Sequence, residues 1–100
     1  MWVSVAALAL LLAPSAPSFG EDADPLLTGL SENARKIVLE SNAMHGGNYQ
    51  GLCGYVTRDL NIAVNKGFES LQAKGEIEGP LGFYALESIN YYQKRCRITN

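Results

Sequence analysis

Two cysteines are the feature that most constrains the fold of this 100-residue chain. Cys53 and Cys96 are its only cysteines, and they lie 43 positions apart. In an oxidising compartment, an even cysteine count in a small chain indicates a disulfide framework. Closing a loop of this length stabilises the folded state by about 4 kcal/mol in the chain-entropy model. The sequence therefore predicts an intrachain disulfide between Cys53 and Cys96. The alternative is an interchain bond in a homodimer.

The N-terminal segment predicts that the chain enters such a compartment. Residues 5–13, "VAALALLLA", form an apolar run that is followed by prolines and small residues. This pattern is typical of a secretory signal peptide, whereas a membrane span needs about 20 apolar residues. Ser18 and Gly20 are small residues at the −3 and −1 positions of a cleavage site. We therefore expect residues 1–20 to be a signal peptide, residues 21–100 to be one small secreted domain, and the chain to have no membrane span.

Hydrophobic periodicity predicts an all-α fold. In three segments, apolar residues recur at steps of three and four, which is the period of a helix with one buried face. Asp24 before Pro25 is typical of an N-cap followed by proline at the first helical position, and Thr28 or Ser31 are the alternative caps. The sequence thus predicts a small domain of about three helices, at residues 25–43, 56–74 and 80–96.

The third predicted helix carries Cys96 on its apolar side. Leu81, Ala85, Ile89, Tyr92 and Cys96 follow one another at helical steps and form one stripe. If the second and third helices form an antiparallel hairpin, the start of one meets the end of the other. The predicted disulfide would then close the open end of that hairpin.

Adjacent aromatic residues on the third helix indicate a surface for a partner. Phe83 precedes Tyr84, and Tyr91 precedes Tyr92. Because neighbours on a helix point in different directions, the two members of a pair are not expected to face the same core together. One member of each pair should point outward. An exposed apolar patch often marks a protein-binding surface, although these side chains could instead cover loops or the first helix. The residues that we expect to form the patch are Phe83, Leu86, Asn90 and Tyr91.

The stretch from residue 43 to residue 56, "AMHGGNYQGLCGYV", resembles a site in composition only. Its glycines suit a loop that reverses the chain, and the spacing lacks the lysine and hydroxyl residue of a phosphate-binding loop. His45 could serve as an acid or base, or act with Cys53 in nucleophilic catalysis. A disulfide-bonded cysteine is not a nucleophile, however, and a lone histidine in such a loop is usually solvated. We therefore predict no catalytic residue, no metal site and no cofactor.

Charge limits the classes of partner. Eight basic and ten acidic residues give a net charge of −2, and the one basic cluster, at residues 94–97, is too small to neutralise nucleic-acid phosphates. This cluster is better explained as the C-terminus of a helix, where cations are favourable. Nucleic acid is therefore not an expected partner. Two dibasic pairs are candidate processing sites for a convertase: Arg35 with Lys36, and Lys94 with Arg95.

These observations lead to one expected function and two alternatives. We expect a secreted helical protein that acts non-enzymatically by binding an extracellular or cell-surface protein. The first alternative is a precursor, or the truncated N-terminal part of a larger secreted protein. The second is a carrier of a small apolar ligand.

Overall fold

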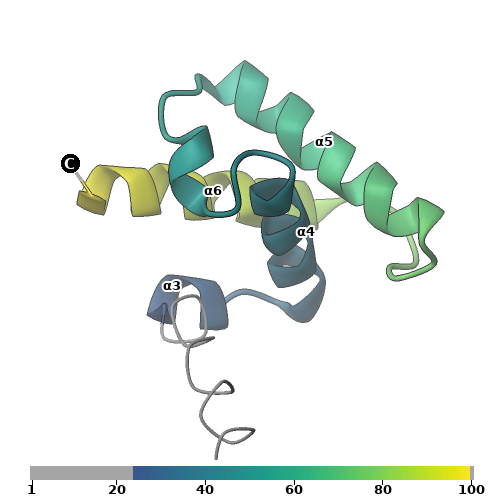
Figure 1. Ribbon diagram of the computed structural model, residues 1–100. Coiled ribbons are helices and arrows are strands. Elements are labelled where there is room, and N and C mark those ends of the chain that lie inside the picture. The colour runs from purple at the N-terminus through teal and green to yellow at the C-terminus, as the bar shows by residue number, and fades with distance from the viewer. Residues whose placement is uncertain (1–23, 100) are drawn as a thin grey trace, which may run out of the picture.

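The computed structural model describes residues 24–99, so the predicted signal peptide at residues 1–20 lies outside the described part. Within residues 24–99 the chain is all-α and contains no strand. This part of the chain has four α-helices and one 3-10 helix, which are α3 (Pro25–Thr28), α4 (Glu32–Ala43), η2 (Tyr49–Leu52), α5 (Thr57–Ala73) and α6 (Phe83–Thr99). Figure 1 shows how the α-helices are arranged. The predicted all-α class is confirmed.

Helices α4, α5 and α6 all pack against one another, and η2 packs on α4 and α6. Tyr92 is the largest side chain that is fully buried in this core. Its hydroxyl donates to the Val38 carbonyl oxygen at 3.1 Å and to Asn42 Oδ1 at 2.7 Å, so its polar tip is satisfied on α4. Tyr92 belongs to one cluster of buried apolar side chains, to which every element contributes and which includes Leu27, Ile37, Val38, Leu52, Leu60, Val64, Leu71 and Ile89.

The first predicted helix is two helices rather than one. Asp24 caps α3, with Oδ1 accepting from the Leu26 N–H at 3.0 Å, and Pro25 occupies the first helical position. Ser31 caps α4 separately, because its hydroxyl accepts from the Ala34 N–H at 3.3 Å. Both predicted cap positions are therefore used. The prediction of one helix over residues 25–43 was wrong because Ser31 has an extended backbone that interrupts it.

The other two predicted helices, at residues 56–74 and 80–96, differ from the observed helices only at their ends. α5 lies within the predicted 56–74 segment, and Gly75 follows its C-cap with φ +72°. α6 begins at Phe83 instead of residue 80, because Gly82 has φ +50° and cannot belong to a right-handed helix. Among the helices within residues 24–99, none combines the length and the apolar composition that a membrane crossing requires.

The predicted disulfide between Cys53 and Cys96 is present, with the two Cα atoms 5.2 Å apart. Cys53 is the C-cap of η2, shortly before α5, and Cys96 lies near the end of α6. In Figure 1, α5 runs toward the turn at residues 74–82 and α6 runs back from it. The bond therefore connects the two ends of this helical pair that lie away from the turn.

Candidate functional site

The outward side of α6 is the first candidate site. Phe83, Leu86, Asn90, Lys94 and Arg97 are all exposed. At about 100° per residue, their spacing places them within an arc of about 80° on the helix surface. We call these five residues the α6 outer face. The predicted exposure of Phe83, Leu86 and Asn90 is thus confirmed, and the structure adds two cations to the same face.

The expected exposure of Tyr91 was wrong. Tyr91 is only 4% exposed, and its neighbour Tyr92 is fully buried, so both members of this pair face the interior. The reason is that α3 packs on α6 and covers the side of the helix that carries Tyr91. The Tyr91 hydroxyl donates a hydrogen bond to Asp24 Oδ2, at the N-cap of α3, over 2.9 Å. The other pair follows the prediction, since Phe83 is exposed and Tyr84 packs on the core.

Glu87 borders the α6 outer face but is engaged elsewhere. Its carboxylate accepts from the Ser31 N–H at 3.2 Å and from the Ser31 hydroxyl at 2.7 Å. A carboxylate in this position also suits the positive end of α4. Because this anion is directed to Ser31, the charge along the exposed face comes from Lys94 and Arg97. Within residues 24–97, no ion pair involves either of these two cations.

The predicted processing pairs both lie within helices. Arg35 and Lys36 are in α4, where the Lys36 ammonium donates to the Glu76 carbonyl oxygen at 3.0 Å. Lys94 and Arg95 are in α6, and Arg95 Nε lies 3.2 Å from Asp24 Oδ2. Proteases favour exposed loops, so cleavage at either pair would require local unfolding. These residues remain candidates for processing only in such an opened state.

Arg95 belongs to a partly buried polar network that the sequence did not reveal. Its guanidinium lies 4.7 Å from the centre of the Tyr49 ring, in a cation–π arrangement. The same side chain pairs with Asp24, which also accepts the Tyr91 hydroxyl. No spacing rule could have signalled this network, because its members come from α3, η2 and α6.

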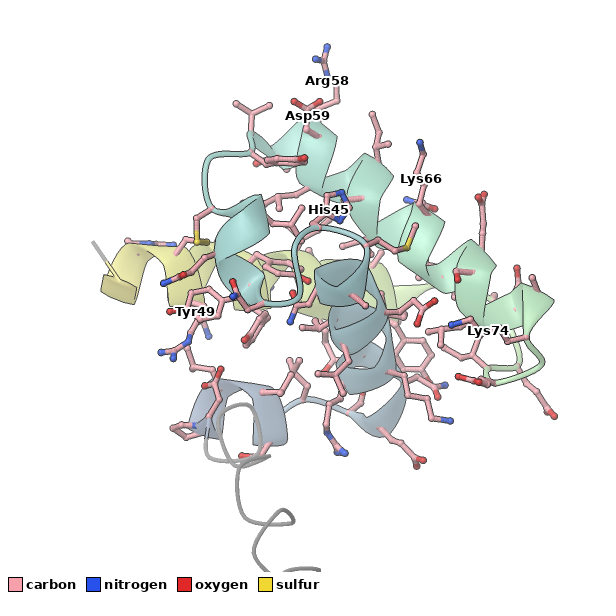
Figure 2. All side chains as sticks on the ribbon, viewed as in Figure 1. His45, Tyr49, Arg58, Asp59, Lys66 and Lys74 are labelled. Carbon is pink, nitrogen blue, oxygen red and sulfur yellow. A yellow bond between two sulfur atoms is a disulfide. The ribbon has the colours of Figure 1, made fainter. Side chains whose placement is uncertain are left out.

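A cleft beside α5 is the second candidate site. It has a volume of about 310 Å³ and lies where the loop after α4 faces α5. In Figure 2 the side chain of His45 lies against α5, between Asp59 and Lys66 along the helix. We call this the His45 cleft. Its lining residues are His45, Tyr55, Asp59, Ile62, Ala63 and Lys66.

The lining of the cleft corrects the expectation that His45 is simply solvated. His45 is half-buried, and its Nδ1 lies 2.8 Å from the Ser41 carbonyl oxygen. Four of the lining residues lie on one face of α5, because they are spaced three, one and three positions apart, and the sequence alone shows this. They are Asp59, Ile62, Ala63 and Lys66. What the sequence could not show was that the loop bearing His45 folds back onto that face.

The charged side chains within residues 24–99 form ion pairs and no metal-ligating cluster. No group of three or more histidine, cysteine or acidic side chains in this part of the chain could hold a metal ion. Besides the pair of Asp24 with Arg95, an ion pair joins Glu40 of α4 to Lys74, with 2.7 Å between Oε2 and Nζ. The Lys74 ammonium and the Ser70 hydroxyl both donate to Glu40, and these bonds lower its pKa. This pair ties α4 to the end of α5.

Comparison with known proteins identifies no relative. The chain matches no protein-family model, no curated protein and no solved structure. The functional argument therefore depends on the two candidate sites themselves.

Proposed function

We propose that this is a secreted protein that acts non-enzymatically, by binding an extracellular or cell-surface protein through the α6 outer face. The observation that carries the proposal is the position of Phe83, whose surface is 83% exposed at the start of α6. Leu86, one turn further on, is 56% exposed. Burying one such side chain in a partner contributes about 1.5–3 kcal/mol, which is the contribution expected of an interface anchor.

The α6 outer face also specifies the chemistry of the partner. Its apolar residues lie at one end, and Lys94 and Arg97 lie at the other, about 17 Å and about 21 Å from Phe83 along the axis at 1.5 Å per residue. A complementary surface would have an apolar pocket for Phe83 and Leu86, and acidic side chains facing the two cations. The proposed partner is therefore a protein with a groove that is apolar at one end and acidic at the other.

Two observations support secretion. Disulfides persist in oxidising compartments and are rare in the cytosol, and the Cys53–Cys96 pair is bonded. The apolar run at residues 5–13, with small residues at positions 18 and 20, has the pattern of a cleavable signal peptide. The partner would then be met outside the cell or at its surface.

A cell-binding assay with single-residue variants tests this function. Each variant replaces one exposed apolar residue. Phe83→Ser and Leu86→Ser each remove an apolar side chain from the α6 outer face. Val56→Ser is the matched control, because Val56 is 60% exposed at the start of α5 and belongs to neither candidate site. We expect Phe83→Ser to weaken saturable binding by about tenfold or more, while Val56→Ser leaves it unchanged. Equal binding by all three variants would remove the α6 outer face as the docking surface.

A further inference from the structure

We propose that the His45 cleft is a separate binding site for a small aromatic carboxylate that carries a hydrogen-bond donor on its ring. This site lies against α5 and shares no residue with the α6 outer face. Its polar groups come from two segments, since His45 follows α4 whereas Asp59 and Lys66 belong to α5. Convergent polar groups around an apolar hollow are the usual form of a small-molecule site.

The orientation of His45 is fixed by its own loop. A carbonyl oxygen only accepts, so Nδ1 must donate its proton to the Ser41 carbonyl oxygen at 2.8 Å. The His45 N–H donates to the Asn42 carbonyl oxygen at 3.0 Å. Gly51 lies so close that a Cβ there would overlap the His45 carbonyl oxygen. In the neutral ring, Nε2 is therefore the acceptor, and no residue of the described range 24–99 donates to it.

The floor and wall of the cleft suit a flat apolar body. Ile62 and Ala63 of α5 contribute apolar surface to the cleft. The Tyr55 ring stands at 89° to the His45 ring, with 5.8 Å between the ring centres. An aromatic ligand ring can pack against aliphatic side chains and meet such aromatic edges favourably. The volume of about 310 Å³ lies at the small end of ligand pockets, which favours a single-ring ligand.

The charges around the cleft select an anion. Asp59 is already paired, since Arg58 Nε lies 3.3 Å from its Oδ1. Lys66 is exposed and forms no ion pair with any residue from 24 to 97. The two are seven residues apart on α5, which separates them by about 10 Å along the helix axis. A ligand carboxylate at Lys66 would thus lie away from Asp59, with its ring donor directed toward His45 Nε2.

An NMR titration of the disulfide-bonded protein tests this site with three related probes. 4-Hydroxyphenylacetate has both polar groups, phenylacetate lacks the ring donor, and 4-hydroxyphenylacetamide lacks the negative charge. We expect saturable 1:1 shifts at the amides of residues 45, 55, 59, 62 and 66, with 4-hydroxyphenylacetate binding most tightly. Absence of saturable shifts at these amides up to about 10 mM of 4-hydroxyphenylacetate would overturn the proposal.

Two variants assign the polar contacts. Lys66→Gln should weaken binding of both carboxylates by about fivefold and leave the amide probe unaffected, whereas Lys36→Gln makes the same charge change on α4, outside the cleft, and should alter nothing. His45→Asn keeps a nitrogen donor near the position of Nδ1, so the loop is retained while Nε2 is lost. The His45→Asn variant should therefore bind 4-hydroxyphenylacetate and phenylacetate with equal affinity. Equal affinities in Lys66→Gln and the unmodified protein would contradict the proposed carboxylate position.

Discussion

The Tyr91 hydroxyl donates to Asp24 Oδ2 at 2.9 Å, a buried bond between residues that are 67 positions apart. The other oxygen of this carboxylate caps α3 through the Leu26 N–H. Arg95 Nε lies 3.2 Å from Oδ2 and completes the charge pair. One carboxylate thus holds α3 against α6. Tyr91 therefore faces α3, beside the α6 outer face and not on it.

Tyr91→Phe removes the bond from Tyr91 to Asp24 while keeping the ring. We expect it to lower the free energy of unfolding by about 1–2 kcal/mol, because Asp24 is left buried with one hydrogen bond fewer. Tyr84→Phe is the control, since the Tyr84 hydroxyl has no hydrogen-bond partner within residues 24–99, and it should change stability by less than about 0.5 kcal/mol. Urea denaturation measures both. Equal effects of the two variants would contradict a stabilising role for this contact.

Replacing both cysteines with alanine removes the constraint on the unfolded chain. The loop between Cys53 and Cys96 spans 43 positions, so the expected loss in unfolding free energy is about 4 kcal/mol. Denaturant titration of the double variant and of the oxidised protein measures the difference. Reduction of the unmodified protein should give the same loss as the double variant. A change smaller than about 1 kcal/mol would mean that the disulfide contributes little to stability.

Gly67→Ala should destabilise the protein, although alanine favours helices by about 1 kcal/mol. A Cβ at residue 67 would overlap the Ser41 hydroxyl and lie 3.3 Å from the Ile37 carbonyl oxygen. Gly67 is thus a point of close approach between α5 and α4, and we expect a net loss of about 1–2 kcal/mol. Gly54→Ala is the control, because a Cβ there meets nothing within 4 Å. A thermal melt in which Gly67→Ala is the more stable variant would contradict this packing.

The Glu40–Lys74 contact predicts a pH-dependent stability. Hydrogen bonds from Lys74 and Ser70 lower the Glu40 pKa below 4.5, so this stabilisation is present above pH 4.5 and is lost as the pH falls through the lowered pKa. The bond to Glu40 raises the Lys74 pKa above 10.5, so its contribution is present below that pH and is lost as the pH rises through the raised pKa. Between these limits, Glu40→Gln should lower the melting temperature slightly.

Melting curves from pH 7 down to about pH 3 check this prediction. The difference between Glu40→Gln and the unmodified protein should shrink as the pH falls below 4.5. Glu69→Gln is the control, because Glu69 is exposed and its carboxylate forms no ion pair or hydrogen bond within residues 24–97. A difference for Glu40→Gln that stays constant over the whole range would contradict a role for the carboxylate charge.

Local signals in the sequence predicted the helices and the disulfide, because both depend on periodicity, caps and cysteine count. The same signals offered Ser31 as an alternative to Asp24 and did not show that both would cap a helix. The contact of Ser31 with Glu87 of α6, 56 positions away, has no local signal either. Tyr91 was misplaced for a similar reason, because helical period alone cannot show that a second element covers the neighbouring stripe. The two candidate sites also differ in whether the sequence could predict them. Phe83 and Leu86 could be predicted from one helix, whereas the His45 cleft needs two segments brought together.

The most direct test of docking through the α6 outer face is a crosslink from residue 83 itself. A photoreactive phenylalanine analogue at position 83 keeps the aromatic anchor, and the same analogue at Val56 serves as the control at the start of α5. After irradiation on intact cells, we predict one protein crosslinked from position 83, competed away by unlabelled protein but not by its Phe83→Ser variant. Identical crosslinking from both positions, or competition by Phe83→Ser as strong as by the unmodified protein, would contradict this docking mode.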